Sequence, residues 1–501
     1  MGGLQVFLMS KYEYKQALIN AEKLDDYLRD IGLDVPVIIY GAGKNGHLVA
    51  QHLLRIGASI KCFVDLNKDV QGDRPFFVDV VSPQTMKKDY NNEPIIITPY
   101  SGGNVVEEFL ALADFPKDRI YRLEFDLVSF ELSLSDKNQT SPSQLMYMQT
   151  VPLNPPITVF SIIYNTPEHY LRRSIESVLN QSFRNFEYFI VDHGSNDGTT
   201  SRIINEYAAL DKRIKVYRTP VNVEVERQQG RESAKPREAL FQEIKKRITT
   251  EYMCWLDSDD FFYDNFLEYS YTAIIKHHSD LVCVQSTTYE EDNHENVRFQ
   301  WYPILSNEII ANTEKEKWLA FCETRMPEAG WSVLARSEIY LNAFHMSWSC
   351  PNGLTTDKLS AFEMLKESNV AVFTRTPHHT LTLRSTSSVG GRKSLDWRYM
   401  LNWYNWMISG WLGETKGNCE RLNLDSRRCA YSLGQYVVEF IYSMSDKLTK
   451  YRMREELGDF YRELKLLIAD EYISDIIDSR KIYREWYTKL ADFFKNEQVV
   501  I

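Results

Sequence analysis

Apolar runs that alternate with amphipathic segments occupy the middle of this chain. A β-branched run at 158–164 breaks at 165–167, which contains a proline, and a second apolar run spans 186–191. Between these two runs, apolar side chains recur at helical spacing, at Leu171, Ile175, Val178 and Leu179. A helical pattern at 203–207 and a third apolar run at 214–217 follow. Strand, helix, strand, helix, strand in this order predicts a parallel sheet.

A further apolar run, 253–256, leads directly into Asp257, Ser258 and Asp259. Two carboxylates therefore stand one residue apart at the end of a predicted strand. Ligands of open parallel sheets bind outside the carboxyl ends of the strands, where Asp192 would also lie. Carboxylate oxygens suit a hard cation such as Mg or Mn, and two of them leave coordination positions for a diphosphate. Alone the triplet is a weak signal, because most Asp-x-Asp triplets are solvated turns.

Four segments resemble those of the inverting nucleotide-sugar glycosyltransferases of family 2, which have the GT-A fold. In chain order they match the first strand (161–165), the first helix (174–183), the nucleotide-binding turn (191–199) and the metal motif (256–260) of that family. The resemblance covers residues 155–390, about half of the chain. One residue departs from the pattern, because His193 stands where the family usually has a second acidic residue that contacts the base. The base preference, normally uracil, therefore stays open.

The resemblance also implies a role for individual residues. It implies nucleotide-sugar-binding residues at Tyr164, Asp192, His193, Arg237, Asp257 and Arg384. It implies Mn or Mg as the cofactor, with metal ligands at Asp259 and at His379, and it puts His379 and Arg384 in a loop after a strand at 370–374. It places the general base at Asp357, in the first turn of an amphipathic helix, with Glu328 as the alternative. Thr356 replaces a Glu that often precedes this base in the family.

The N-terminal part has its own strand–turn–helix pattern. An apolar run at 35–40 leads into Gly41-Ala42-Gly43-Lys44-Asn45-Gly46, and a second run, 60–64, ends at Asp65. This is the G-x-G-x-x-G fingerprint with an acidic residue about 20 positions on, and the unit resembles a truncated Rossmann domain. One hypothesis is nucleotide or dinucleotide binding. We favour the other, in which the glycines only permit a tight turn and close packing, because the unit lacks room for a substrate domain.

The pattern divides the chain into four parts, and the predicted fold class is α/β. They are a Rossmann-like domain (1–132), a polar, proline-bearing linker (133–156), a GT-A domain (157–390) and a helical C-terminal domain (391–501). In the last part, large apolar residues recur at helical spacing, at Trp397, Met400, Leu401, Tyr404 and Met407. The simpler hypothesis is that these helices pack on the transferase domain. The alternative is an acceptor-binding or membrane-surface module.

Composition narrows the classes of protein. The net charge of −11 disfavours a nucleic-acid-binding protein, so no nucleic-acid partner is expected. The seven cysteines are scattered without a C-x-x-C pair, which is typical of reduced thiols in the cytosol. No signal peptide is recognisable, and no apolar run approaches the roughly 18 residues of a membrane span. We expect a cytoplasmic enzyme, and a peripheral contact with the inner face of the membrane stays open.

The sequence therefore predicts a metal-dependent inverting glycosyltransferase. It would move a single sugar from a nucleotide-diphosphate sugar, first of all a UDP-sugar, to a hydroxyl of a glycan, lipid-linked glycan or glycoprotein, in bacterial surface polysaccharide or glycoconjugate synthesis. A nucleotidyltransferase is an alternative, but it needs a Gly-rich basic loop where this chain has 164–168. A non-catalytic binding or scaffold protein is another, disfavoured by intact Asp257, Asp259 and Asp357. The donor sugar, linkage and oligomeric state stay open.

Overall fold

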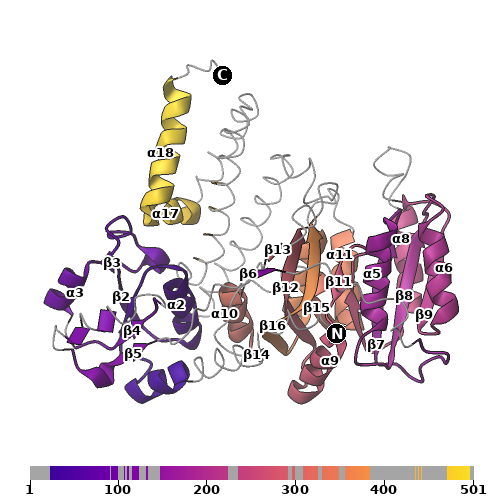
Figure 1. Ribbon diagram of the computed structural model, residues 1–501, viewed down its shortest axis with the longest axis horizontal. Coiled ribbons are helices and arrows are strands. Elements are labelled where there is room, and N and C mark those ends of the chain that lie inside the picture. The colour runs from indigo at the N-terminus through magenta and orange to yellow at the C-terminus, as the bar shows by residue number, and fades with distance from the viewer. Residues whose placement is uncertain are drawn as a thin grey trace.

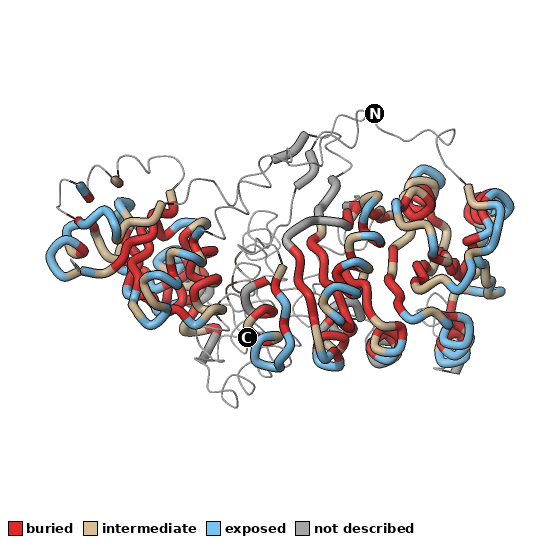
Figure 2. Tube along the Cα trace, turned by 90° about the horizontal axis from the view of Figure 1, so that it is seen from below, coloured by how far each residue is buried: buried red, intermediate tan, exposed pale blue. Residues whose placement is uncertain are grey.

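Two sheets organise the chain in the computed structural model, one in the N-terminal part and one in the centre (Figure 1). The structure describes residues 23–90, 92–99, 106–107, 110–111, 115–122, 131–133, 147–223, 235–290, 296–298, 308–324, 330–348, 356–383, 431, 435, 438, 442 and 471–496. Most strand residues of both sheets are buried, and most exposed residues lie on the helices and turns outside them (Figure 2). The predicted α/β fold class is confirmed.

The N-terminal sheet has five parallel strands in the order β3-β2-β1-β4-β5, which is the doubly wound order. Its elements are β1 (Val37–Tyr40), α2 (Lys44–Ile56), β2 (Ile60–Val64), η1 (Pro75–Phe77), β3 (Val80–Val81), α3 (Pro83–Asp89), β4 (Ile95–Ile97), η2 (Lys117–Arg119) and β5 (Ile120–Arg122). The central strands β1 and β4 are apolar throughout and wholly buried, as parallel strands covered on both faces require. The strands expected at 35–40 and 60–64 are confirmed.

Packing accounts for the first and third glycines of the fingerprint. Gly41 has a φ of 110°, which a side chain would strain, and a Cβ at Gly46 would lie 1.9 Å from the carbonyl oxygen of Gly41. A Cβ at Gly43 would meet open space. The carboxylate of Asp65 accepts the N–H of Ala42 at 2.8 Å, so this acidic residue holds the turn itself. The structural hypothesis explains these residues without a ligand, and the absence of nucleotide binding stays a prediction.

The central sheet is mixed and, among the described residues, has eleven strands. Its main path is β11-β16-β12-β15-β10-β7-β8-β9, with β6, β13 and β14 attached beside it. Its elements are β6 (Glu131–Ser133), β7 (Ile157–Ile163), α5 (Glu168–Leu179), β8 (Phe186–His193), α6 (Thr200–Leu210), β9 (Ile214–Thr219), α8 (Lys235–Arg247), β10 (Tyr252–Trp255), β11 (Phe261–Phe262), α9 (Phe266–His277), β12 (Leu281–Glu290), β13 (Asn296–Arg298), β14 (Glu308–Ala311), α10 (Glu314–Thr324), η5 (Gly330–Ser332), β15 (Val333–Arg336), α11 (Ser337–Trp348), α12 (Thr356–Glu367) and β16 (Ala371–Leu383). Strands β10, β7, β8 and β9 are mutually parallel, as predicted.

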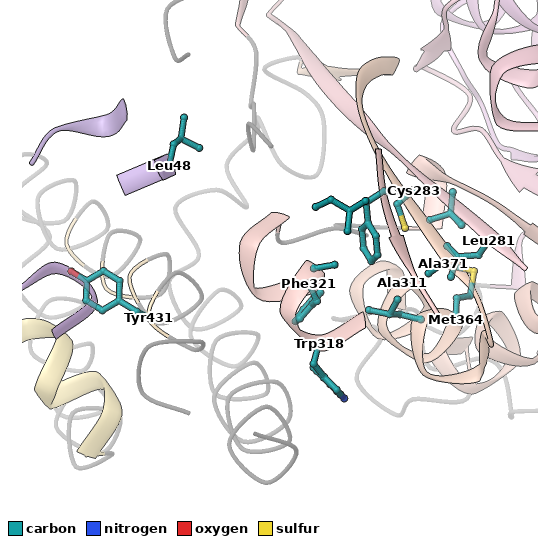
Figure 3. Packing of buried hydrophobic residues seen from close by; sticks show 14 of the residues in the cluster. Leu48, Leu281, Cys283, Ala311, Trp318, Phe321, Met364, Ala371 and Tyr431 are labelled. Atoms are coloured by element: carbon teal, nitrogen blue, oxygen red, sulfur yellow. The ribbon is translucent and has the colours of Figure 1, made fainter. Parts of the chain in front are cut away.

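Apolar periodicity explains how the helices cover this sheet. The four residues spaced along α5 are each at most 1% exposed, and they pack against the buried strands β7 and β8. Burying a side chain of this size contributes about 1.5–3 kcal/mol. At the other end of the sheet, Phe321 from α10 packs with Ala311 from β14 and Met364 from α12 (Figure 3). This second contact holds α12, which carries Asp357, against the sheet.

The C-terminal helices α17 (Glu471–Ser479) and α18 (Lys481–Asn496) pack on the N-terminal unit. The N–H of Arg74 donates to the carbonyl of Ser479 at 2.6 Å, and the N–H of Lys481 donates to Asp73 at 2.6 Å. The ring of Phe76 lies 4.5 Å from that of Tyr431. The simpler hypothesis from the sequence places these helices on the transferase domain, whereas these contacts are with the N-terminal unit. The helices predicted around residues 397–407 lie outside the described residues.

None of the helices in the described ranges combines the length and the apolar character that a membrane crossing requires.

The glycine turn provides a test of this packing. Gly46→Ala should lower the midpoint of thermal unfolding by several degrees, because overpacking of this kind costs about 1–3 kcal/mol. Gly43→Ala is the matched control and should leave the midpoint within about one degree, because its Cβ meets open space. Scanning calorimetry of the full chain measures both. Equal midpoints for the two variants would contradict the close approach of Gly46 to Gly41.

Candidate functional site

The carboxyl ends of β10, β7 and β8 lie side by side, because these strands are neighbours in the sheet. The chain passes from β7 to β8 and β9 on one side and then crosses to β10 on the other side of β7. Ligands in such sheets bind where the strand order reverses, here between the ends of β7 and β10. The hydroxyls of Thr166 and Ser258 are 2.7 Å apart and join the two turns across this point. Tyr164, half-buried, directly follows β7.

Asn165 fastens the turn after β7 to the turn after β8. It adopts a left-handed backbone with a φ of 45°, a conformation that Asn tolerates better than most residues. Its amide nitrogen donates to Asn196 at 2.8 Å, and its amide oxygen accepts the N–H of Asn196 at 2.9 Å. Asp197 then accepts the N–H groups of Thr199 and Thr200, where α6 begins. The turn at 193–198 is therefore fixed by polar side chains on both sides.

Asp192 lies at the end of β8 with 2% of its surface exposed. Its carboxylate accepts the N–H of Ser195 at 3.2 Å and the hydroxyl of Ser201 at 2.5 Å, and Arg218 lies 3.4 Å away. The side chain thus organises the turn that was predicted to bind the nucleotide. Direct contact between Asp192 and a base stays a prediction.

His193 is buried beside Asp192 and is held as a neutral ring. Its Nε2 accepts the backbone N–H of Val223 at 3.1 Å, so the ring proton is on Nδ1. Burial lowers the pKa of His193 to about 4. The next residue, Gly194, has a φ of 73°, and a Cβ there would lie 2.4 Å from the backbone of Val221. The departure from the family pattern therefore has a structural role, since His193 binds the 221–223 segment to the end of β8.

The acidic turn, residues 257–260, follows β10. The indole N–H of Trp255 donates to the Asp257 carboxylate at 2.7 Å, and the hydroxyl of Ser174 donates to the carbonyl of Asp257 at 3.1 Å. Asp257 and Asp259 are half-buried, whereas Asp260 is 1% exposed. The first two can meet a ligand, and the third faces inward.

The donor set of the acidic turn fits a hard divalent cation that arrives with a diphosphate. Asp257 and Asp259 offer carboxylate oxygens, the ligands that Mg and Mn favour. Within the described ranges, no group of three or more His, Cys, Asp or Glu side chains is arranged to hold a metal ion. These ranges therefore provide only part of a ligand set, and the phosphates and water would complete it.

His379 lies inside the protein, at 0% exposure. Its ring stacks on Trp331 with centroids 4.5 Å apart, Nδ1 lies 3.3 Å from the hydroxyl of Ser286, and Nε2 lies 3.4 Å from the carboxylate of Asp260. Burial lowers the pKa of His379 to about 3, although the charge of Asp259 acts in the opposite direction. Both ring nitrogens face protein side chains, so binding a metal would require the ring to turn. The ligand role of His379 stays a prediction.

The strand that carries His379 is longer than expected. The sequence predicted a strand at 370–374 followed by a loop, whereas β16 continues to Leu383. Pro377 lies within this strand, although proline has no N–H to donate to a sheet. The register against β12 shifts on both sides of the Pro377–Gln285 pair, so β16 accommodates proline within a bulged stretch. Placing His379 in a loop was therefore wrong.

The remaining predicted residues are placed only in part. Arg237 is the third residue of α8 and is half-buried. Asp357 is the second residue of α12, which agrees with its expected place in a first helical turn, but its side chain is not among those described. Arg384 and Glu328 lie outside the described residues.

Sequence reasoning missed Arg173 and Thr382. The guanidinium of Arg173 donates to the carbonyl of Asp259 at 3.1 Å and to the hydroxyl of Thr382 at 2.7 Å. An arginine in the middle of a helix and a threonine in a strand have no local pattern that would connect them.

The neutral His193 ring generates a pH prediction. The pKa of His193 is about 4 in the folded state and 6.5 ordinarily, so between these pH values the unfolded chain binds the proton more readily than the folded protein. The folding stability that the neutral ring provides is therefore complete above pH 6.5 and is lost as the pH falls toward 4. Between pH 7.5 and pH 5 this loss is about 2 kcal/mol. His193→Gln retains an acceptor for Val223 and cannot be protonated. Its free energy of unfolding should therefore fall by that much less than the wild type's between about pH 7.5 and about pH 5. Urea unfolding at both pH values measures the difference, and equal losses in the two proteins would contradict the neutral ring.

Comparisons with known proteins relate part of the chain to glycosyltransferases. Residues 158–327 match the family model described as Glycosyl transferase family 2. An uncharacterized glycosyltransferase of Haemophilus influenzae is 36% identical over 124 residues, which cover 25% of this chain and 44% of that protein. Poly(ribitol-phosphate) beta-N-acetylglucosaminyltransferase TarP of Staphylococcus aureus is 29% identical over 129 residues, 25% of this chain and 35% of that protein. The matched segments thus span less than half of either relative.

Among solved structures, the crystal structure of S. aureus TarS 1-349 aligns with a TM-score of 0.41 and 17% identity, covering 69% of this chain and 93% of that chain. The similarity rests instead on the family model, whose match contains nearly all of β7 and the whole of β8, β9 and β10, and on the curated relatives. Residues 158–327 are therefore similar to glycosyl transferase family 2, and the structure of this segment is of the α/β class that its sequence predicted.

Proposed function

We propose that this chain is a Mn- or Mg-dependent inverting glycosyltransferase that moves one sugar from a nucleotide-diphosphate sugar to an acceptor hydroxyl. The observation that carries the proposal is that Asp192, at the end of β8, and Asp257 and Asp259, after β10, lie at the same edge of the sheet on either side of β7, within the segment that matches the family 2 model. A UDP-sugar is the donor we infer first, because the family normally binds uracil, although His193 replaces one acidic residue.

Each turn would bind a different part of the donor. The turn at 193–198, held by Asn165 and Asp192, would bind the nucleoside, with Tyr164 and Arg237 beside it. Asp257, with one oxygen already bonded to Trp255, would contact the ribose or the metal, and Asp259 would bind the metal. A bound divalent ion supplies charge neutralisation for the departing diphosphate. The protein's task at this edge is to hold these groups in place before the donor arrives.

Asp357 is the residue we assign as the general base. The acceptor hydroxyl must lose a proton as it attacks the anomeric carbon, and a positioned carboxylate can accept it. Asp357 is in the first turn of α12, whose residue Met364 packs into the core with Phe321, so the base would stand on a rigid element. A single displacement attacks opposite the leaving group and therefore inverts the anomeric configuration.

Two alternatives are less well supported. A nucleotidyltransferase would need a Gly-rich basic loop after β7, and the turn there contains Asn165, Thr166 and Pro167 instead. A scaffold role would leave the half-buried carboxylates of Asp257 and Asp259 without a chemical role, and Trp255 and Ser174 hold their turn in place.

The acceptor is a further proposal. TarP, by its name, transfers N-acetylglucosamine to poly(ribitol-phosphate), a hydroxyl-bearing polymer. We therefore infer a hydroxyl of a glycan, lipid-linked glycan or glycoprotein, in the synthesis of a bacterial surface polysaccharide or glycoconjugate. A cytoplasmic location, with peripheral contact at the inner face of the membrane, would suit such an acceptor.

The metal role can be tested directly. EDTA should abolish transfer, and Asp259→Ala should abolish transfer and weaken donor binding, because the ion joins the carboxylate to the diphosphate. Release of nucleoside diphosphate reports transfer, and calorimetric titration with UDP reports binding. Asp69→Ala, which removes an exposed carboxylate from the N-terminal unit, should change neither. Full activity in EDTA would exclude the metal role.

The base can be separated from donor binding. Asp357→Asn keeps the shape of the side chain and should lower turnover by about 10² to 10⁴-fold while donor affinity stays nearly unchanged. Glu363→Gln removes another carboxylate from the same helix, one that pairs with Lys366 at 3.5 Å, and should leave turnover near normal. Proton NMR of the product should show inverted configuration. Normal turnover in Asp357→Asn, or a retained configuration, would refute this mechanism.

A further inference from the structure

Three elements that are distant in the sequence meet at the guanidinium of Arg173, in the second turn of α5. One nitrogen, Nη2, donates to the carbonyl of Asp259 at 3.1 Å and to the hydroxyl of Thr382 at 2.7 Å. Asp259 belongs to the acidic turn, and Thr382 is the penultimate residue of β16. Arg173 therefore connects the first helix of the family 2 segment to the acidic turn and to the far side of the sheet.

Aromatic rings restrict the position of this guanidinium. It lies 4.6 Å from the ring centre of Phe261, the residue directly after the acidic turn, and 5.5 Å from that of Tyr170 on its own helix. Cations over aromatic faces are attracted by the ring quadrupole, and the planar guanidinium donates in fixed directions. The side chain is half-buried, so its hydrogen bonds are less exposed to competition from water than those of a surface arginine.

Thr382 contacts the acidic turn directly, in addition to its hydrogen bond with Arg173. Its backbone N–H donates to the carboxylate of Asp260 at 2.8 Å, while its hydroxyl accepts from Arg173. Thr382 is 3% exposed and Asp260 is 1% exposed, so both contacts lie in the interior. One residue of β16 thus fixes the second half of the acidic turn through two routes, and Arg173 completes one of them.

We propose that Arg173 is a positioning residue for the acidic turn and acts through Thr382. The carboxylates of Asp257 and Asp259 are like charges one residue apart, and they repel each other most strongly when no cation is between them. Arg173 and Thr382 hold the backbone of this turn, so the two carboxylates are in place before the metal and the diphosphate bind. This inference rests on the proposed function, in which Asp257 and Asp259 contact the donor and its ion.

Arg172 is the matched control for Arg173. It is the preceding residue on the same helix, carries the same charge, and pairs with Glu168 at 2.8 Å and with Glu206 at 2.9 Å, away from the acidic turn. Arg173→Met should weaken the binding of nucleoside diphosphate in the presence of Mn by about tenfold, the size expected for losing charged hydrogen bonds. Arg172→Met should leave that affinity within about twofold. Calorimetric titration of the full chain measures both, and circular dichroism gives the unfolding midpoints.

A second comparison tests the route through Thr382. Thr382→Val removes the hydroxyl that accepts from Arg173 and keeps the backbone N–H that donates to Asp260. Thr382→Ser keeps both groups. The valine variant should weaken Mn-dependent binding severalfold, and the serine variant should resemble the wild type. Combining Arg173→Met with Thr382→Val should weaken binding no further than Arg173→Met alone, because the valine removes only a hydrogen bond that Arg173→Met has already removed.

The metal dependence separates positioning from a general structural role. Loss of affinity in Arg173→Met should be large with Mn and small in EDTA, where the acidic turn contributes little to binding. A merely structural effect would weaken binding equally in both conditions. An Arg173→Met variant that binds as tightly as wild type, or losses that add fully with Thr382→Val, would overturn the inference while the proposed function stands. If wild type binds none of UDP, GDP, CDP, dTDP or ADP with Mn, the proposed function itself fails.

Discussion

The candidate site depends on holding three acidic side chains within four residues at the end of a buried strand. Like charges this close repel, and a turn without partners would relax toward solvent. Trp255 and Ser174 hold the first residue of the turn, and Thr382 holds the last through the Asp260 carboxylate. Each restraint comes from a different element, so the geometry of the turn is a property of the whole sheet.

The same principle applies to the neighbouring turn after β8. Its restraints come from Asn165 in the previous turn, from the buried Asp192, and from His193, whose ring accepts the N–H of Val223. A carboxylate at position 193 could not stay charged against a buried backbone without further partners, whereas a neutral imidazole can. The histidine at position 193 thus provides a hydrogen bond within the protein, and its contact with a base stays a prediction.

The N-terminal unit and the C-terminal helices pack on each other, whereas the simpler hypothesis from the sequence placed those helices on the transferase domain. The glycine turn of the N-terminal unit is explained by the close approach of Gly46 to Gly41 and by the bond from Ala42 to Asp65. The last two helices bind this unit through Asp73 and Arg74. Phe76 and Phe77 adopt a left-handed backbone, with φ of 54° and 58°, which is strained for residues with a side chain. This strained stretch is where Phe76 packs against Tyr431.

By itself the sequence determined the alternation of strands and helices, their parallel pairing, and which strand ends carry Asp192 and Asp257. These features follow from local patterns, because apolar side chains recur along consecutive residues with the period of a strand or of a helix. Only the tertiary structure decided that β16 continues past Pro377, that His379 faces inward, and that Arg173 meets Thr382, 209 positions later. Such contacts depend on the register between strands that are far apart in the chain, and no local periodicity encodes that register.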